Sequence, residues 1–84
     1  MNSQRKFIKN LLLTLPPIKT EKFLQMMRLP RSNYKVMHGL YVDRLCQQEV
    51  ADLIFMSLET VKRRNAEGLD IILKSLDAVD LTQF

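Results

Sequence analysis

The side chains with the clearest chemical potential lie in one short run, residues 57–64, which reads SLETVKRR. Its three adjacent cations, Lys62, Arg63 and Arg64, can donate charge-assisted hydrogen bonds to anionic groups. Glu59 adds an acceptor, and the two hydroxyls of the run can donate or accept. A run of charged residues is often only the solvent-exposed face of a helix. Whether this run binds an anion therefore depends on the element that carries it.

No other residues support catalysis or metal binding. His38 is the one histidine and has no partner at a spacing typical of a catalytic pair. Cys46 is the one cysteine, so the chain has neither an internal disulfide nor a Cys/His set with metal-ligand spacing. We therefore expect no enzymatic activity, no cofactor and no metal. A free thiol and the lack of any apolar run near the roughly 20 residues of a membrane span predict a cytoplasmic protein.

Charge is distributed unevenly along the chain. Residues 1–41 hold eight Lys/Arg and one acid, residues 42–64 hold four of each sign, and residues 65–84 hold one lysine and four acids. A basic first half with an acidic end suits a polyanionic partner, because the acidic end can stay away from the anion.

Apolar spacing predicts an all-α fold of about five helices. They are expected over about 3–14, 20–28, 33–41, 47–54 and 58–76. Hydroxyl or thiol side chains are the expected N-caps of the last four helices: Thr20, Ser32, Cys46 and Ser57. Glu49, three residues after Cys46, suggests a capping box.

The last two expected helices each have a buried face and an exposed face. On the fourth, Val50, Ala51 and Leu53 are expected in the core. On the fifth, mostly apolar or small side chains recur every three or four residues and predict a buried stripe: Val61, Asn65, Gly68, Leu69, Ile72 and Leu76. The opposite, exposed side is expected to hold Leu58, Glu59, Lys62, Arg63 and Ala66.

A short helix, a turn of three or four residues and a longer helix form the helix-turn-helix pattern. In that geometry the first helix lies across the DNA backbone, and the second enters the major groove by its N-terminal turns. The groove is about 12 Å wide and admits one α-helix, and every base pair presents a distinct pattern there. Residues 47–76 therefore predict a DNA-binding element.

Short sequence motifs occur in a characteristic order from Leu29 to about Leu73. They are Leu29-Pro30, Val36, LYVDRL at 40–45, EVADL at 49–53, Met56-Ser57 and TVK at 60–62. In order and spacing they resemble region 4 of the bacterial sigma-70 family and, as a second choice, the LuxR-type helix-turn-helix domain. Phe55 stands where sigma proteins usually have glycine, and Cys46 where they usually have serine or threonine.

The resemblance implies base-edge contacts from four residues, Leu58, Glu59, Lys62 and Arg63. Their chemistry agrees, because Arg and Lys can donate to guanine, Glu can accept from cytosine, and Leu can contact the thymine methyl group. Phosphate contacts are expected from residues near the two helix N-termini and from the last arginine of the run: Gln47, Gln48, Ser57, Thr60 and Arg64.

The resemblance also implies a transcription regulator that binds double-stranded DNA. We expect the phage or mobile-element type, encoded by a bacterium or phage, because 84 residues leave no room for the promoter-melting region of a complete sigma factor. RNA polymerase is a further candidate partner, since region 4 docks on it in sigma proteins. The alternative function is an adaptor that contacts RNA polymerase or another regulator without binding DNA.

We expect a single domain over 1–84, with a helical extension at 1–28, a DNA-binding core at 29–76 and an acidic tail at 77–84. The role of the extension is open. Its apolar stripe either packs on the core or meets the C-terminal end of the fifth helix in a homodimer: Phe7, Ile8, Leu11, Leu12 and Leu15. Membrane binding is disfavoured, because the stripe is short and lacks tryptophan.

Overall fold

The computed structural model describes residues 3–78. Its elements are α1 (Ser3–Thr14), α2 (Pro17–Met26), α3 (Arg31–Met37), the π-helical turn η1 (His38–Val42), α4 (Gln47–Leu53) and α5 (Leu58–Ala78). The described part contains no strand, so the all-α expectation is confirmed. The first helix has the bounds that its sequence predicts. Of the expected acidic tail, residues 77–78 end α5, and residues 79–84 lie outside the described residues.

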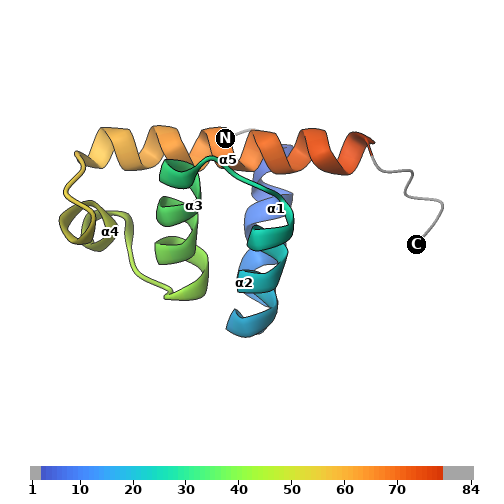
Figure 1. Ribbon diagram of the computed structural model, residues 1–84, viewed down its shortest axis with the longest axis horizontal. Helices are drawn as coiled ribbons and strands as arrows, with labels where there is room; N and C mark the ends of the chain where they lie inside the picture. The colour runs from blue at the N-terminus through green and yellow to red at the C-terminus, as the bar shows by residue number, and fades with distance from the viewer. Residues whose placement is uncertain (1–2, 79–84) are drawn as a thin grey trace.

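The helix α5 runs along one edge of the fold, and the other elements pack on one side of it (Figure 1). The helix α1 runs away from α5, α2 runs back toward it, and α3 runs away again, so all three cross its direction. The helix α4 lies beside the N-terminal end of α5 and is seen nearly end-on in Figure 1. As a result, the first half of α5 borders α4, and its later turns border α1.

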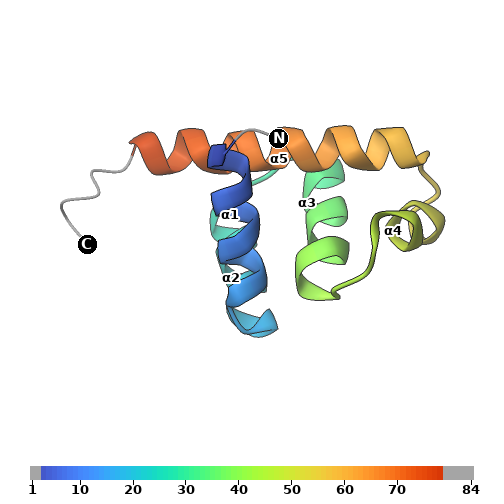
Figure 2. The same ribbon diagram turned by 180° about the vertical axis from the view of Figure 1, so that it is seen from behind.

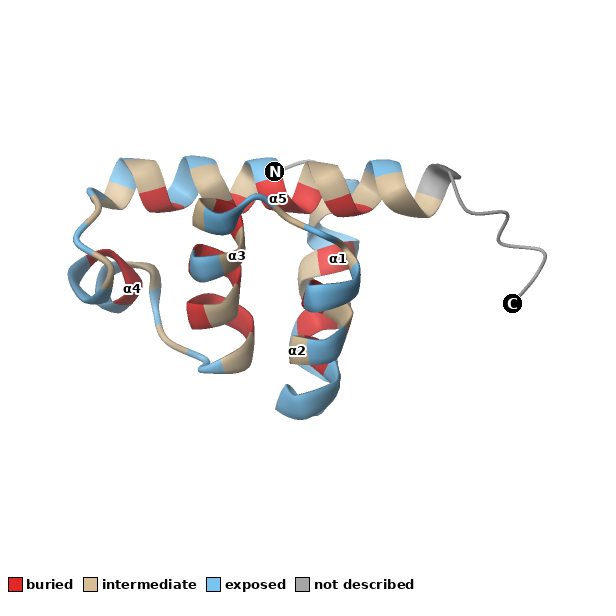
Figure 3. Cartoon of the chain, viewed as in Figure 1, coloured by how far each residue is buried: buried red, intermediate tan, exposed pale blue. Residues whose placement is uncertain are grey.

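All the helices contribute to one buried apolar cluster. Its members are Ile8, Leu12, Leu24, Val36, Met37, Leu40, Tyr41, Val50, Ala51, Val61, Leu69 and Ile72. The buried side of α5 faces the other helices (Figure 3), and its predicted stripe is confirmed, with Leu76 half-buried. Leu53 was wrongly expected in the core, because it is 61% exposed. At 3.6 residues per turn, it lies about a third of a turn from the face of α4 that carries Val50 and Ala51.

Prolines, rather than hydroxyl caps, begin α2 and α3. The expected N-caps Thr20 and Ser32 are wrong, because α2 already starts at Pro17 and α3 starts directly after Pro30. Pro17 suits the first helical position of α2, since the φ of proline is already helical and the N–H that it lacks would have no intrahelical partner, whereas Pro30 is the N-cap residue of α3. Thr20 is instead buried inside α2, where its Oγ1 donates to the Leu12 carbonyl at 2.9 Å and ties α2 to α1.

The turn η1 lies close to α4 at Gly39. A Cβ atom at Gly39 would stand 2.8 Å from Cγ2 of Val50, well inside the usual carbon–carbon contact distance. Glycine therefore allows the two elements to approach. The same turn carries His38, whose Nε2 lies 2.7 Å from a Glu21 carboxylate oxygen and whose Nδ1 lies 3.2 Å from one of Asp43. The fold thus places two carboxylates beside His38. The one from α2 could not be expected from the residues next to His38 in the sequence.

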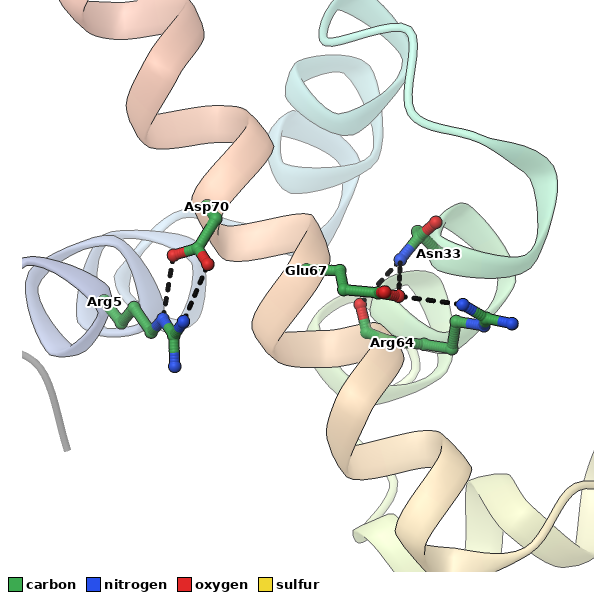
Figure 4. Close-up of polar contacts among 5 residues, drawn as sticks. All are labelled: Arg5, Asn33, Arg64, Glu67 and Asp70. Carbon is green, nitrogen blue, oxygen red and sulfur yellow. Dashed lines mark hydrogen bonds and ion pairs between the residues drawn. The ribbon is translucent and has the colours of Figure 1, made fainter.

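An ion pair holds the first half of α1 on α5. Arg5 donates from Nε to Oδ1 of Asp70 at 2.8 Å and from its Nη2 to Oδ2 at 2.7 Å (Figure 4). These hydrogen bonds hold the pKa of the Asp70 carboxyl below its ordinary value of 3.8. Because both side chains are partly exposed, solvent screens the pair, and its contribution to stability is modest.

The Arg5–Asp70 pair predicts an acid-dependent contribution to stability. A carboxyl whose pKa is lowered by folding stabilises the protein above its unfolded-state pKa, and this contribution is lost as the pH falls through the folded-state value. We expect Asp70→Asn to lower the thermal midpoint slightly at neutral pH and to flatten its fall below about pH 4. Arg5→Gln should flatten it in the same way. Thermal unfolding followed by circular dichroism over a range of pH measures the midpoint. If it falls at acid pH as steeply in both variants as in the wild type, the prediction is contradicted.

Candidate nucleic-acid interface

The helices α4 and α5 are joined by the four-residue turn 54–57, and both begin with the caps that the sequence predicts. The Cys46 N–H donates to Oε1 of Glu49 at 3.0 Å in a capping box, which lowers the pKa of the Glu49 carboxyl. At the start of α5, Oγ of Ser57 accepts the Thr60 N–H at 3.1 Å. Each cap satisfies an N–H that a helix start otherwise leaves unpaired.

The turn itself contains a residue in the left-handed region. Phe55 has φ 57°, and the next N–H, that of Met56, donates to the Ala51 carbonyl at 3.0 Å. This bond pattern is that of a Schellman motif, which usually has glycine at the left-handed position. Phe55 therefore adopts the conformation that glycine favours, at a steric cost, and its side chain is 95% exposed.

The N-terminal half of α5 presents the predicted exposed face in part. Glu59, Lys62 and Arg63 are exposed, whereas Leu58 and Ala66 are half-buried. In the described part of the chain, neither Lys62 nor Arg63 has a carboxylate within ion-pair distance. Their charges are therefore available to an external anion.

The expected phosphate-contacting residues fall into two groups. Ser57 and Thr60 lie at the start of α5, with their hydroxyl oxygens 2.8 Å apart. Gln47 and Gln48 begin α4, and Nε2 of Gln48 donates to Oδ1 of Asp52 at 3.0 Å. Both glutamines line a groove that Leu58 and Lys62 also line, so the structure brings these four predicted residues together.

Arg64 lies on the opposite flank of α5. Its Nη1 donates to Oε1 of Glu67 at 2.9 Å, and Nδ2 of Asn33 bonds both the Arg64 carbonyl, at 2.9 Å, and the same Glu67 oxygen, at 3.3 Å (Figure 4). The hydrogen bond from Arg64 is the main cause of the lowered pKa of Glu67. The structure thus pairs Arg64 with an acid next to α3 and does not bring it to the groove of Lys62.

Sequence reasoning missed two basic residues of this region, Lys9 and Arg44. Both line the groove with Lys62, although they belong to α1 and to the segment between η1 and α4. Lys9 lies beside the apolar stripe of α1, which is the only local signal that it faces away from the core. No signal in the sequence indicates that it faces α5.

No protein-family model, curated protein or solved structure matches this chain. The likeness to sigma-70 region 4 therefore depends on the residues quoted from the sequence. Within residues 3–78, no helix is long and apolar enough to cross a membrane, and no three His, Cys, Asp or Glu residues form a group that could hold a metal ion.

Proposed function

We propose that this protein binds duplex DNA with α4 and α5 acting as a helix-turn-helix, and that it thereby regulates transcription. The observation that carries the proposal is the pair Lys62 and Arg63, which is exposed and has no ion-pair partner in the described part of the chain. Both lie in the first two turns of α5, outside its buried stripe, where a recognition helix contacts bases. The resemblance to sigma-70 region 4, and through it to regulators of phage or mobile-element type, supports the same assignment.

The proposed contacts follow from side-chain chemistry. Residues about 57–66 enter the major groove, where Arg63 and Lys62 donate to guanine and Glu59 accepts from cytosine N4. Leu58 contacts a thymine methyl group. Phosphate contacts are proposed for Gln47, Gln48, Ser57 and Thr60. Arg64 is left out of this set, because its guanidinium is paired with Glu67 and does not line the groove of Lys62.

A titration against a mixed pool of duplex DNA tests the proposal. The folded protein is titrated at two salt concentrations, and the bound DNA is recovered and sequenced. A specific reader should enrich one motif, and its affinity should fall steeply with salt, because each phosphate contact releases counterions. A palindromic motif would add that the protein binds as a dimer. Weak binding without enrichment would sink the proposal of groove reading.

A second candidate function is favoured by the apolar tip of the α4–α5 turn. Leu53 and Phe55 are exposed there, beside a hollow that Tyr34 and Met56 also line. Exposed apolar patches can mark protein contacts, so the alternative is an adaptor that binds RNA polymerase or another regulator. A pulldown from bacterial lysate with and without nuclease separates the two functions. An adaptor should keep its partner after the DNA is destroyed.

A further inference from the structure

The groove that contains Lys62 is basic on several sides. It lies between α1, the end of η1, the start of α4 and α5, and three cations line it, Lys9, Arg44 and Lys62. None of its lining residues is acidic. Two other hollows of the described part contain carboxylates, Asp43 in one and both Glu67 and Asp70 in the other. Of these three hollows, this groove is the one that combines several cations with no carboxylate in its lining.

The groove has a neutral, buried floor. The Tyr41 hydroxyl donates to Oδ1 of Asn65 at 2.6 Å, and both residues are buried. Burial raises the pKa of Tyr41 to about 12, so its hydroxyl stays protonated and adds no negative charge. The positive charge of the lining residues is thus undiminished near neutral pH.

Arg44 also attaches α1 to the segment that precedes α4. Its Nη1 donates to the Leu13 carbonyl at 2.7 Å and its Nη2 to the Leu15 carbonyl at 2.9 Å. These bonds satisfy carbonyls at the C-terminal end of α1, and a cation is favourable there. Lys9 lies one turn before Leu13 on the same helix and has no ion-pair partner in the described chain.

We propose that this groove holds the sugar-phosphate backbone of one strand of the bound duplex, so that α1 is part of the DNA interface. The inference rests on the proposed function and extends it. Gln47, Gln48 and Lys62, which are proposed to contact DNA, already line the groove, so a strand that they contact runs past its mouth. Lys9 from α1 and Arg44 from the segment before α4 lie in the same groove as Gln47 and Gln48, and such a spread of donors suits a run of successive phosphates better than one small anion. Lys9 is then a phosphate contact that does not read sequence.

Replacing Lys9 tests the inference through the salt dependence of binding. The dissociation constant of Lys9→Gln is measured on a selected and on a random duplex over a series of salt concentrations. Loss of one phosphate contact should make the negative slope of log K against log salt shallower by about 0.9 and should weaken binding to both duplexes alike. Lys22→Gln is the matched control, because Lys22 is exposed on α2 and outside the groove. Lys9→Arg keeps the charge and should restore wild-type binding.

The outcomes separate this inference from the proposed function. If the wild-type protein binds no duplex, the proposed function itself fails. If the wild-type protein binds but Lys9→Gln has the affinity and the salt slope of Lys22→Gln, the groove does not hold a strand and only this inference is overturned. Inorganic phosphate at matched ionic strength is a further arm. Displacement of DNA by it would indicate a site for a small anion and would also overturn the inference.

Discussion

Ile8→Ala is expected to lower the free energy of unfolding by about 2–5 kcal/mol. Ile8 is fully buried in the cluster that α1 shares with the other helices, so the truncation loses apolar burial and leaves a cavity. A chain of 84 residues has a total stability of only about 4–13 kcal/mol, so the truncation should remove a large share of it and move the urea midpoint clearly down. Urea unfolding followed by circular dichroism measures the change.

Phe7→Ala is the matched control on the same helix. Phe7 has the larger side chain but is 64% exposed, so its truncation should change the stability little. A similar loss in both variants, with a wild-type stability that rises with protein concentration, would contradict this. It would mean that Phe7 is buried in a homodimer, the other role that the sequence left open for this stripe.

The helices were predictable where the local signals agreed. Pro16 follows α1 and disfavours helical geometry in the residue before it, so the end of this helix could be read from the sequence. The stripe on α5 repeats over about four turns, so the pattern does not depend on any single residue. Thr20 and Ser32 were wrongly predicted as N-caps because their hydroxyls suit that position when only the local sequence is considered. Their helices had already begun at or after prolines.

The site was predictable only in part, because its members come from distant parts of the sequence. The exposed position of Lys62 and Arg63 follows from helical periodicity alone. The pairing of Arg64 with Glu67 is a local contact, yet Asn33, which orients both, lies on α3, 31 positions before Arg64. The presence of Lys9 in the same groove as Lys62 depends on how α1 packs on α5. No spacing in the sequence encodes that packing.

Arg63→Ala is expected to weaken binding to a selected duplex by about 1–3 kcal/mol, or roughly 5- to 150-fold in Kd. Arg63 is exposed in the second turn of α5 and has no ion-pair partner in the described chain, so its guanidinium can make a bidentate contact with guanine O6 and N7. A base contact contributes to the preferred sequence alone. The loss should therefore be large on the selected duplex and small on random duplex.

Lys74→Ala is the control for charge, because Lys74 is exposed on nearly the same side of α5 but lies three turns further along. At 1.5 Å per residue, it is roughly 16 Å from Arg63 along the helix axis, beyond the turns that enter the groove. Its removal should leave sequence preference unchanged. If Arg63→Ala weakens selected and random duplex equally, Arg63 is a phosphate contact, and base reading by α5 then depends on Glu59 and Lys62. If Arg63→Ala and Lys74→Ala are indistinguishable on both duplexes, the first turns of α5 do not enter the major groove.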